Sequence, residues 1–149
     1  MIQRIQTLYM LLSSVLIGLL FALPFAEIVD ASNQIYTFNV EGVQSASGEL
    51  IQNGWAVALL IGIMLLLQVV AIFMYKKRIL QIRLLNYVIL LIFGLTGLLF
   101  FFVLKSFDGA VINYQLSMVF PIIAAILNYL AIRAIGKDEA LIRSVDRIR

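Results

Sequence analysis

The chain has 149 residues, of which 63% are apolar and 13% charged, and its formal net charge is +3. Soluble domains are about 45–50% apolar and about 25% charged, and the core of one small domain does not enclose so much apolar surface. The composition therefore excludes an ordinary water-soluble domain and indicates one small membrane domain. The chain contains no Cys and no His, which excludes thiolate chemistry and removes the commonest metal ligand and general base.

Four apolar stretches each approach the roughly 20 residues that a transmembrane helix needs. They cover residues 7–25, 55–75, 84–104 and 117–135. A helix satisfies its own backbone hydrogen bonds in lipid. The sequence therefore predicts an all-α transmembrane four-helix bundle that forms a single domain over residues 1–149.

The first stretch has an alternative interpretation as a cleaved signal peptide. Arg4 provides a basic start, and Ala26 is a small residue at the end of the stretch. The apolar stretch is nevertheless longer than in most signal peptides, and Pro24 stands where a small residue should precede the cut. A retained helix is the favoured interpretation.

Basic residues are concentrated in segments that share one side of the membrane in this topology. The connection 76–83 carries four of them and no acid, the segment from Arg133 onward carries five, and Arg4 lies at the start. The connection 26–54 has four acidic residues and no basic one. Because Lys and Arg favour the cytoplasmic side, the sequence predicts that both termini are cytoplasmic (N-in, C-in).

The outer connection 26–54 is too long for a bare helix hairpin. Residues 34–40 alternate polar and apolar side chains and include β-branched and aromatic residues, a pattern typical of a strand. Glu41-Gly42 and residues 45–48 are turn signals. We expect a small outer β-hairpin-like loop between the first two helices. The second outer connection covers residues 105–116.

The cytoplasmic tail, residues 136–149, is predicted to form a short amphipathic helix. Leu141, Val145 and Ile148 lie on one face at helical spacing. Such a helix would lie on the anionic inner leaflet, where each basic residue contributes about 1 kcal/mol, or dock on a cytoplasmic partner. A solvated continuation of the fourth helix is an equally good interpretation.

Two kinds of residue are candidates for contacts between helices. Ser14, Gly18 and Ala22 follow one another at four-residue intervals, and such small residues let two helix backbones approach closely. Gln68 and Asn128 carry amides that must find hydrogen-bond partners in lipid. We expect these amides to hold helices together, and a ligand path is the alternative.

No motif indicates an enzyme, a cofactor or a metal site. The sequence has no Gly-rich phosphate loop, zinc motif or nucleophile elbow. The outer carboxylates of Glu27, Asp30, Glu41 and Glu49 offer cation ligands, but nothing fixes their spacing, and a solvated acidic loop explains them better. The basic run 76–78 is explained by topology rather than by nucleic acid.

Three predicted cytoplasmic stretches resemble a known family. They are Met1-Ile2-Gln3-Arg4-Ile5-Gln6-Thr7, Leu80-Gln81-Ile82-Arg83, and Leu130-Ala131-Ile132-Arg133-Ala134-Ile135 with Lys137-Asp138-Glu139 and Arg143-Ser144-Val145-Asp146-Arg147-Ile148-Arg149. Over its whole length the chain is similar to a family of small four-span membrane proteins of unknown function from Bacteroidota. The resemblance implies a bacterial inner-membrane location, and it implies no reaction and no catalytic residue.

The polar residues of these stretches exceed what topology requires, because orientation needs only Lys and Arg. We expect them to form a polar cluster, the cytoplasmic rim, that locks the helix ends together or docks a partner. The candidate members are Gln3, Arg4, Gln81, Arg83, Arg133, Lys137, Asp138, Glu139, Arg143, Asp146 and Arg147.

Three functions are compatible with the sequence. The first is a non-enzymatic accessory, scaffold or assembly subunit of a larger inner-membrane complex, with the lipid bilayer and other membrane proteins as partners and no nucleic acid. The second is a small homo-oligomeric carrier or channel for a neutral or lipidic substrate, and it requires a continuous polar path built from Gln68, Asn86, Thr96 and Asn128. The third is a lipid-handling enzyme or another membrane enzyme that uses the outer carboxylates.

Overall fold

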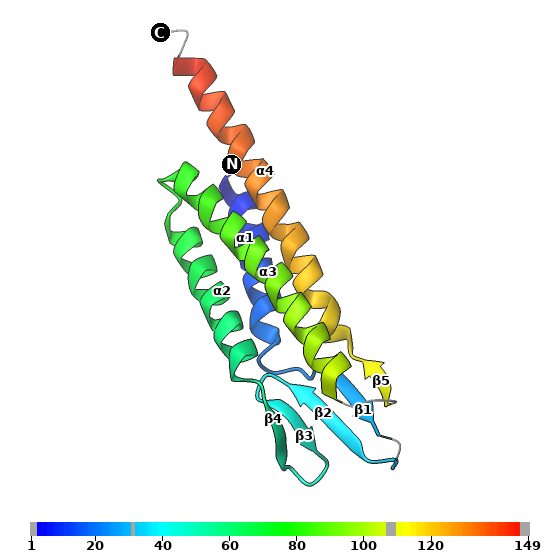
Figure 1. The fold of residues 1–149 in the computed structure, drawn as a ribbon. Helices are drawn as coiled ribbons and strands as arrows, with labels where there is room; N and C mark the ends of the chain where they lie inside the picture. The colour runs from blue at the N-terminus through cyan, green and yellow to red at the C-terminus, as the bar shows by residue number, and fades with distance from the viewer. Residues whose placement is uncertain (1–2, 31, 107–109, 147–149) are drawn as a thin grey trace.

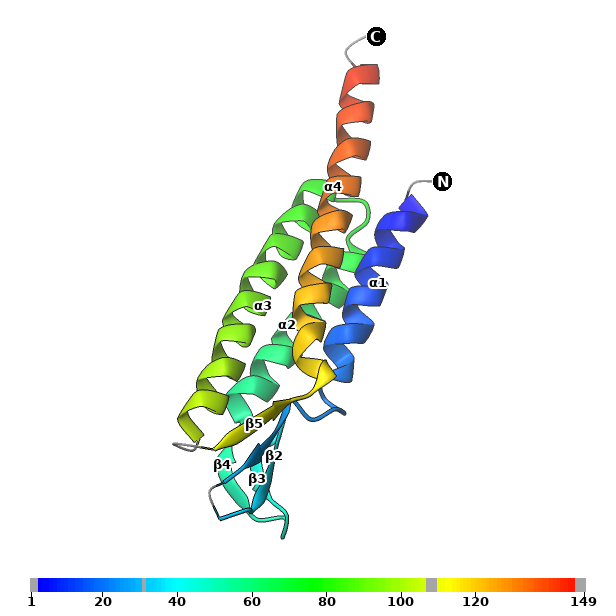
Figure 2. The ribbon, with the colours of Figure 1, turned by 90° about the vertical axis from the view of Figure 1, so that its right-hand side faces the viewer.

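The protein consists of four helices that lie side by side and a small β-sheet that covers one end of them (Figure 1, Figure 2). The computed structural model describes residues 3–30, 32–106 and 110–146, and the side chains of residues 5–30, 32–104, 110–142 and 144. The elements in chain order are α1 (Gln3–Leu19), β1 (Ala26–Val29), β2 (Ile35–Asn39), β3 (Gly42–Ser45), β4 (Leu50–Asn53), α2 (Trp55–Phe73), α3 (Arg78–Ser106), β5 (Val111–Tyr114), the 3-10 helix η1 (Leu116–Val119) and α4 (Phe120–Asp146).

The two ends of the molecule differ in what they carry. The end covered by the strands is called the sheet end. The opposite end, called the terminal end, holds the start of α1, the turn between α2 and α3, and the end of α4 (Figure 1). The acidic connection and the basic connection of the sequence therefore lie at opposite ends of the helices.

The prediction of an all-α fold is wrong, because a five-stranded antiparallel sheet accompanies the helices in the order β4-β3-β2-β1-β5. The expected hairpin-like loop is instead four strands between α1 and α2, and β5 joins them from the connection between α3 and α4. Each strand has only four or five residues. In a run of four or five residues, the spacing of apolar side chains does not distinguish a strand from a continuation of the apolar helix beside it.

One face of the sheet packs on the helix ends. Ile28, Tyr36 and Phe38 are buried, while the residues that alternate with them along β1 and β2 are more exposed; this is the pattern of a sheet with one covered face. The Phe38 ring centroid lies 5.2 Å from that of Phe25 and 5.7 Å from that of Phe102 on α3. Aromatic contacts thus fix the sheet to the end of α3.

The turn between β2 and β3 approaches β4 very closely at Gly42. This residue has a φ of +131°, in the region that favours glycine. A Cβ atom at this position would lie 1.8 Å from the backbone oxygen of Gln52. Nearby, the backbone N–H of Gly54 donates to the oxygen of Glu41 at 2.7 Å. Only glycine fits at position 42 without displacing the strand.

Each helix buries one seam whose residues follow one another at alternating spacings of three and four. This seven-residue repeat is typical of helices that interlock side chains at a crossing angle of about 20°. Neighbouring helices pack as α1–α2, α2–α3, α3–α4 and α4–α1, so α2 and α4 are diagonal. The seams are Gln6, Met10, Ser13 and Ile17 on α1, continued by Leu20 just after it; Val57, Ile61, Met64, Gln68 and Ala71 on α2; Gln81, Leu85, Val88, Ile92, Leu95, Leu99 and Phe102 on α3; and Pro121, Ala124, Asn128, Ala131, Ile135 and Asp138 on α4.

Within the described residues, three helical stretches are long and apolar enough to cross a membrane. They are Trp55–Phe73, Arg78–Leu104 and Leu116–Ile142. The apolar part of α1, Ile5–Leu19, is shorter. After α1 the chain continues in tight turns, with the N–H of Leu23 donating to the oxygen of Leu19 at 3.1 Å.

The expected separate tail helix is also absent from the described fold, because α4 runs without a break from Phe120 to Asp146. Its last turns extend beyond the ends of the other helices (Figure 1, Figure 2). Leu141 is exposed there. The side chain of Val145 and all of Ile148 lie outside the described parts of the chain. The alternative interpretation, a continuation of the fourth helix, agrees with the structure.

Candidate functional site

The centre of the helices is occupied by a pair of side-chain amides. Nε2 of Gln68 on α2 donates to Oδ1 of Asn128 on α4 at 2.7 Å and to the backbone oxygen of Met10 on α1 at 3.1 Å. Nδ2 of Asn128 donates back to Oε1 of Gln68 at 3.4 Å. Both side chains are fully buried. The pair therefore connects three helices across the interior.

Further buried polar groups flank this pair, and each one bonds to another element. Nε2 of Gln81 donates to the oxygen of Ala71 at 3.0 Å and contacts Sδ of Met10 at 3.4 Å. Oγ of Ser13 donates to the oxygen of Ala124 at 3.3 Å. At the sheet end, the hydroxyl of Ser117 donates to the oxygen of Pro24.

At the terminal end, α1 and α4 are joined by a hydrogen bond from Nε2 of Gln6 to Oδ2 of Asp138 at 2.5 Å. Both side chains are buried. The acceptor is ionisable and the donor neutral, so this is a charge-assisted bond when Asp138 is ionised. It holds the start of α1 against α4 at Asp138, which is the next buried residue after Ile135 on the same side of α4.

The residues of the predicted cytoplasmic rim separate into two groups. Gln81, Asp138 and Glu139 make contacts between elements, whereas Arg83, Arg133 and Lys137 are exposed. For the remaining candidates, the side chains of Gln3, Arg4, Arg143 and Asp146 and the whole of Arg147 lie outside the described parts of the chain.

The predicted small-residue face of α1 makes no close approach to another helix. Oγ of Ser14 donates to the oxygen of Met10 in its own helix at 2.8 Å. A Cβ atom added to Gly18 would meet no atom within 4 Å, and Ala22 is exposed. These three residues do not hold the described helices together, in contrast to Gln68 and Asn128.

The four residues required for a polar path do not form one. Gln68 and Asn128 bond to each other, but the Thr96 hydroxyl donates to the oxygen of Ile92 in its own helix at 2.8 Å, and Asn86 is exposed on the outer surface of α3.

The outer carboxylates lie on separate parts of the sheet. Glu27 is in β1, Asp30 follows it, Glu41 is in the β2–β3 turn and Glu49 precedes β4. Among the described residues, no group of three or more Asp, Glu, His or Cys side chains is arranged to hold a metal ion.

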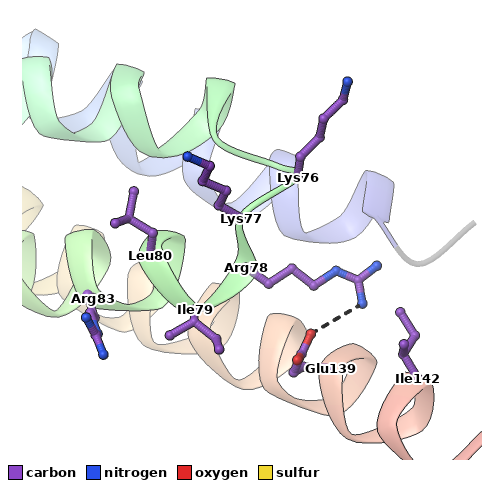
Figure 3. A pocket seen from close by; sticks show the side chains of 8 residues that line it. All are labelled: Lys76, Lys77, Arg78, Ile79, Leu80, Arg83, Glu139 and Ile142. Carbon is purple, nitrogen blue, oxygen red and sulfur yellow. Dashed lines mark ion pairs between the residues drawn. The ribbon is translucent and has the colours of Figure 1, made fainter. Parts of the chain in front are cut away.

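A cavity of about 560 Å³ lies at the terminal end, beside the α2–α3 turn and the end of α4. Nη1 of Arg78 reaches toward Oε2 of Glu139 across this space, at 4.0 Å, and the side chains of Lys76 and Lys77 extend away from that pair (Figure 3). The lining residues are Lys76, Lys77, Arg78, Ile79, Leu80, Arg83, Glu139 and Ile142. We call this space the basic cavity.

A second cavity, of about 380 Å³, lies between α1 and α4 at the same end. It is lined by Ile5, Tyr9, Leu130, Arg133, Ala134, Lys137, Asp138 and Leu141. It carries two cations and one carboxylate, whereas the basic cavity carries four cations and one carboxylate.

Sequence reasoning gave Arg78 and Ser13 no contact between helices, and it placed Gln6 among the polar residues expected to lock the helix ends without naming its partner Asp138. The signal that would have found the two α1 residues is the seam itself, because Gln6 and Ser13 continue the spacing of Met10, Ile17 and Leu20. The role of Arg78 depends on the approach of α4, which is 61 residues away in the sequence at Glu139, so no local pattern indicates it.

Comparison with known proteins identifies one family. The family model described as a domain of unknown function (DUF4293) matches residues 2–148. No curated protein and no solved structure shows significant similarity to the chain.

Proposed function

The chain belongs to the DUF4293 family, and we propose that it is a non-enzymatic integral membrane protein that acts as an accessory or scaffold subunit of a larger complex in a bacterial inner membrane. The proposal has three parts: that the helices are embedded in lipid, that both termini are cytoplasmic, and that the interior serves cohesion rather than transport or catalysis. Each part is supported by a different observation.

Embedding in lipid is supported by the outer surface of the helices. Large apolar side chains are exposed all around them, among them Leu66, Phe73, Leu90, Phe93 and Ile126. Soluble monomers rarely expose continuous apolar surface of this extent, whereas lipid tails solvate it. The helix α2, with 19 residues, is about 28 Å long at 1.5 Å per residue, close to the thickness of the hydrocarbon layer at about 30 Å.

The position of exposed aromatic residues supports the same embedding. Trp55 and Tyr114 lie near the sheet end, and Tyr75 and Tyr87 lie toward the terminal end. Such rings favour the two membrane–water boundaries. We propose α1 as a fourth span, because it packs extensively against α4 and also contacts α2. The basic residues of the terminal end favour a cytoplasmic position for that end, and with it for both termini. The Bacteroidota resemblance stays a prediction that agrees with this location.

The observation that carries the scaffold proposal is the central amide pair. Gln68 and Asn128 close the axis between the helices, and their hydrogen-bonding groups are used by each other and by Met10. A carrier or channel built within one chain needs open polar groups along that axis. The carrier alternative therefore requires a path between copies of the chain. The enzyme alternative requires the outer carboxylates to act together, but they lie on separate parts of the sheet.

The test is extraction of the affinity-tagged chain from native membranes in a mild detergent. We expect a larger membrane protein to co-elute in constant ratio through a second, size-based separation. The matched control is the double variant Gln68→Leu with Asn128→Leu, which lacks the hydrogen bonds between α2 and α4. It shows whether co-elution of the partner depends on the intact interior of the helices. A chain that elutes alone, and that passes small neutral solutes when reconstituted in liposomes, contradicts the scaffold proposal.

A further inference from the structure

The basic cavity carries an excess of positive charge that topology alone does not position. Four cationic side chains line it and only one carboxylate, that of Glu139. Two of the cations come from the α2–α3 turn and two from the first turns of α3. In a membrane-embedded protein, which is the premise of this inference, the cavity lies at the level where lipid head groups end and water begins.

The cation at the centre of this arrangement is incompletely satisfied. The Arg78 side chain is only 19% exposed, and its ion-pair partner Glu139 stands 4.0 Å from Nη1, beyond hydrogen-bond distance. Among the described residues, the enclosed Nη1 has no hydrogen-bond acceptor. A guanidinium offers five N–H donors in a planar fork that matches the oxygens of a carboxylate or a phosphate. Arg78 is thus a partly buried donor in need of an anion.

Two further features favour an anion that carries an apolar tail. Arg78, Ile79 and Leu80 form the first turn of α3, and a helix N-terminus carries free N–H groups and partial positive charge. Beside the cations, the lining also includes exposed apolar side chains, those of Ile79, Leu80 and Ile142. The cavity therefore combines a cationic part with an apolar part that adjoins the outer surface of the helices.

We propose that the basic cavity binds the phosphodiester head group of an anionic phospholipid. Phosphate oxygens accept hydrogen bonds from Arg78, and Lys76 and Lys77 swing toward the same anion from the exposed turn. The acyl chains then follow the apolar side chains of Ile79 and Leu80 along the outside of α3. Bound in this way, the lipid links the α2–α3 turn to the end of α4.

The experiment uses the full chain purified in a neutral detergent, with short-chain phosphatidylglycerol as the probe. Phosphatidylcholine and inorganic phosphate at the same concentrations are the comparison ligands. Bound lipid is counted by native mass spectrometry, and the unfolding temperature is measured with each ligand. The variants are Arg78→Gln and the double variant Lys76→Gln with Lys77→Gln. Because Lys76 and Lys77 are exposed, the double variant should leave the packing of the helices unchanged.

The matched control is Arg133→Gln with Lys137→Gln, which removes two positive charges from the second cavity at the same end. We expect phosphatidylglycerol to bind the wild type and to raise its unfolding temperature. Each charge removed from the basic cavity should weaken binding by about fivefold, since one basic residue contributes about 1 kcal/mol near anionic lipid. The control should bind within about twofold of the wild type.

Three results overturn the proposal. Equal loss of binding in the control means that diffuse charge attracts the lipid. Equal binding of phosphatidylcholine means that the head-group charge is not recognised. Full stabilisation by inorganic phosphate means that the site takes a soluble anion. Carbonate extraction of the native membranes tests the membrane location separately, so a failure there is distinguishable from failure of the lipid site.

Discussion

Gln68 and Asn128 exchange hydrogen bonds between their side-chain amides although their helices, α2 and α4, are diagonal rather than adjacent. The pair spans the interior at the point where Met10 of α1 also contributes its backbone oxygen. An amide at one seam position is a known means of fixing the register of packed helices. This single contact thus sets the axial positions of three helices at once.

Replacement of the central amides should weaken the protein in a coupled way. Gln68→Ala and Asn128→Ala each remove both hydrogen bonds between the two side chains. A double-mutant cycle should therefore give a coupling free energy of about 0.6–1.7 kcal/mol, from the average to the largest value found for membrane helices. Unfolding free energies in mixed micelles provide the measurement. Thr96→Val is the control, because the hydroxyl of Thr96 donates to the oxygen of Ile92 within its own helix. Additive effects of the two alanines would show that the amides act independently.

Gly42→Ala should disrupt the sheet while leaving the helices intact. The added methyl collides with the oxygen of Gln52, and the backbone has a positive φ, so the cost should be about 3 kcal/mol or more. Hydrogen exchange should then be faster in β2–β4 than in α2. Gly62→Ala is the matched control, since no atom lies within 4 Å of the new Cβ and alanine favours a helix by about 1 kcal/mol. Equal effects of the two substitutions would refute the close approach at Gly42.

The two neighbouring acids of α4 should differ in their contribution to stability. Asp138→Ala leaves the buried amide of Gln6 without its acceptor, which costs about 1–3 kcal/mol. Glu139→Ala removes a partly exposed ion pair at 4.0 Å, and such pairs contribute about 0–1 kcal/mol. The comparison is made by unfolding in the same micelles. A larger loss of unfolding free energy for Glu139→Ala than for Asp138→Ala would show that Glu139, and not Asp138, is the acid that stabilises this end of the protein.

The orientation can be tested directly, because the chain has no native Cys. Single substitutions Ile5→Cys, Ser47→Cys and Lys77→Cys place one thiol at the start of α1, in the β3–β4 turn and in the α2–α3 turn. A membrane-impermeant maleimide should label Ser47→Cys in intact spheroplasts and the other two only after permeabilisation. Labelling of Ile5→Cys from outside would show that α1 is not a span.

Much of the helical part could be predicted from the sequence, whereas of the sheet only β2 was, because it lies within the predicted strand 34–40. The stretches 55–75 and 84–104 carry no charged residue and few polar ones over a membrane thickness, so their helices are indicated by length and composition alone. In contrast, β1 follows directly after the apolar run that ends at Phe25, and three of its four residues are apolar, so hydropathy does not separate the strand from that run. Its pairing with β5 depends on residues more than 80 positions away, and no local signal carries such information.

Only some of the contacts between helices could be predicted from the sequence. In a membrane protein both the buried and the lipid-facing sides of a helix are apolar, so hydropathy does not indicate which side is inside. Polar residues do: Gln68 and Asn128 were expected to bond between helices, and they do so. Gly18 was expected at a close helix contact and has open space, because small residues are as compatible with a lipid-facing side as with an interface.

The strand order has a consequence for how the chain is assembled during synthesis. The strand β1 becomes the neighbour of both β2 and β5, yet β5 is synthesised only after the whole of α3. Until then, the β5-facing edge of β1 presents unpaired backbone groups, which attract other strands. Pairing of β5 therefore completes the sheet, and it ties the connection between α3 and α4 to the connection between α1 and α2, so the fourth helix is anchored through the first strand.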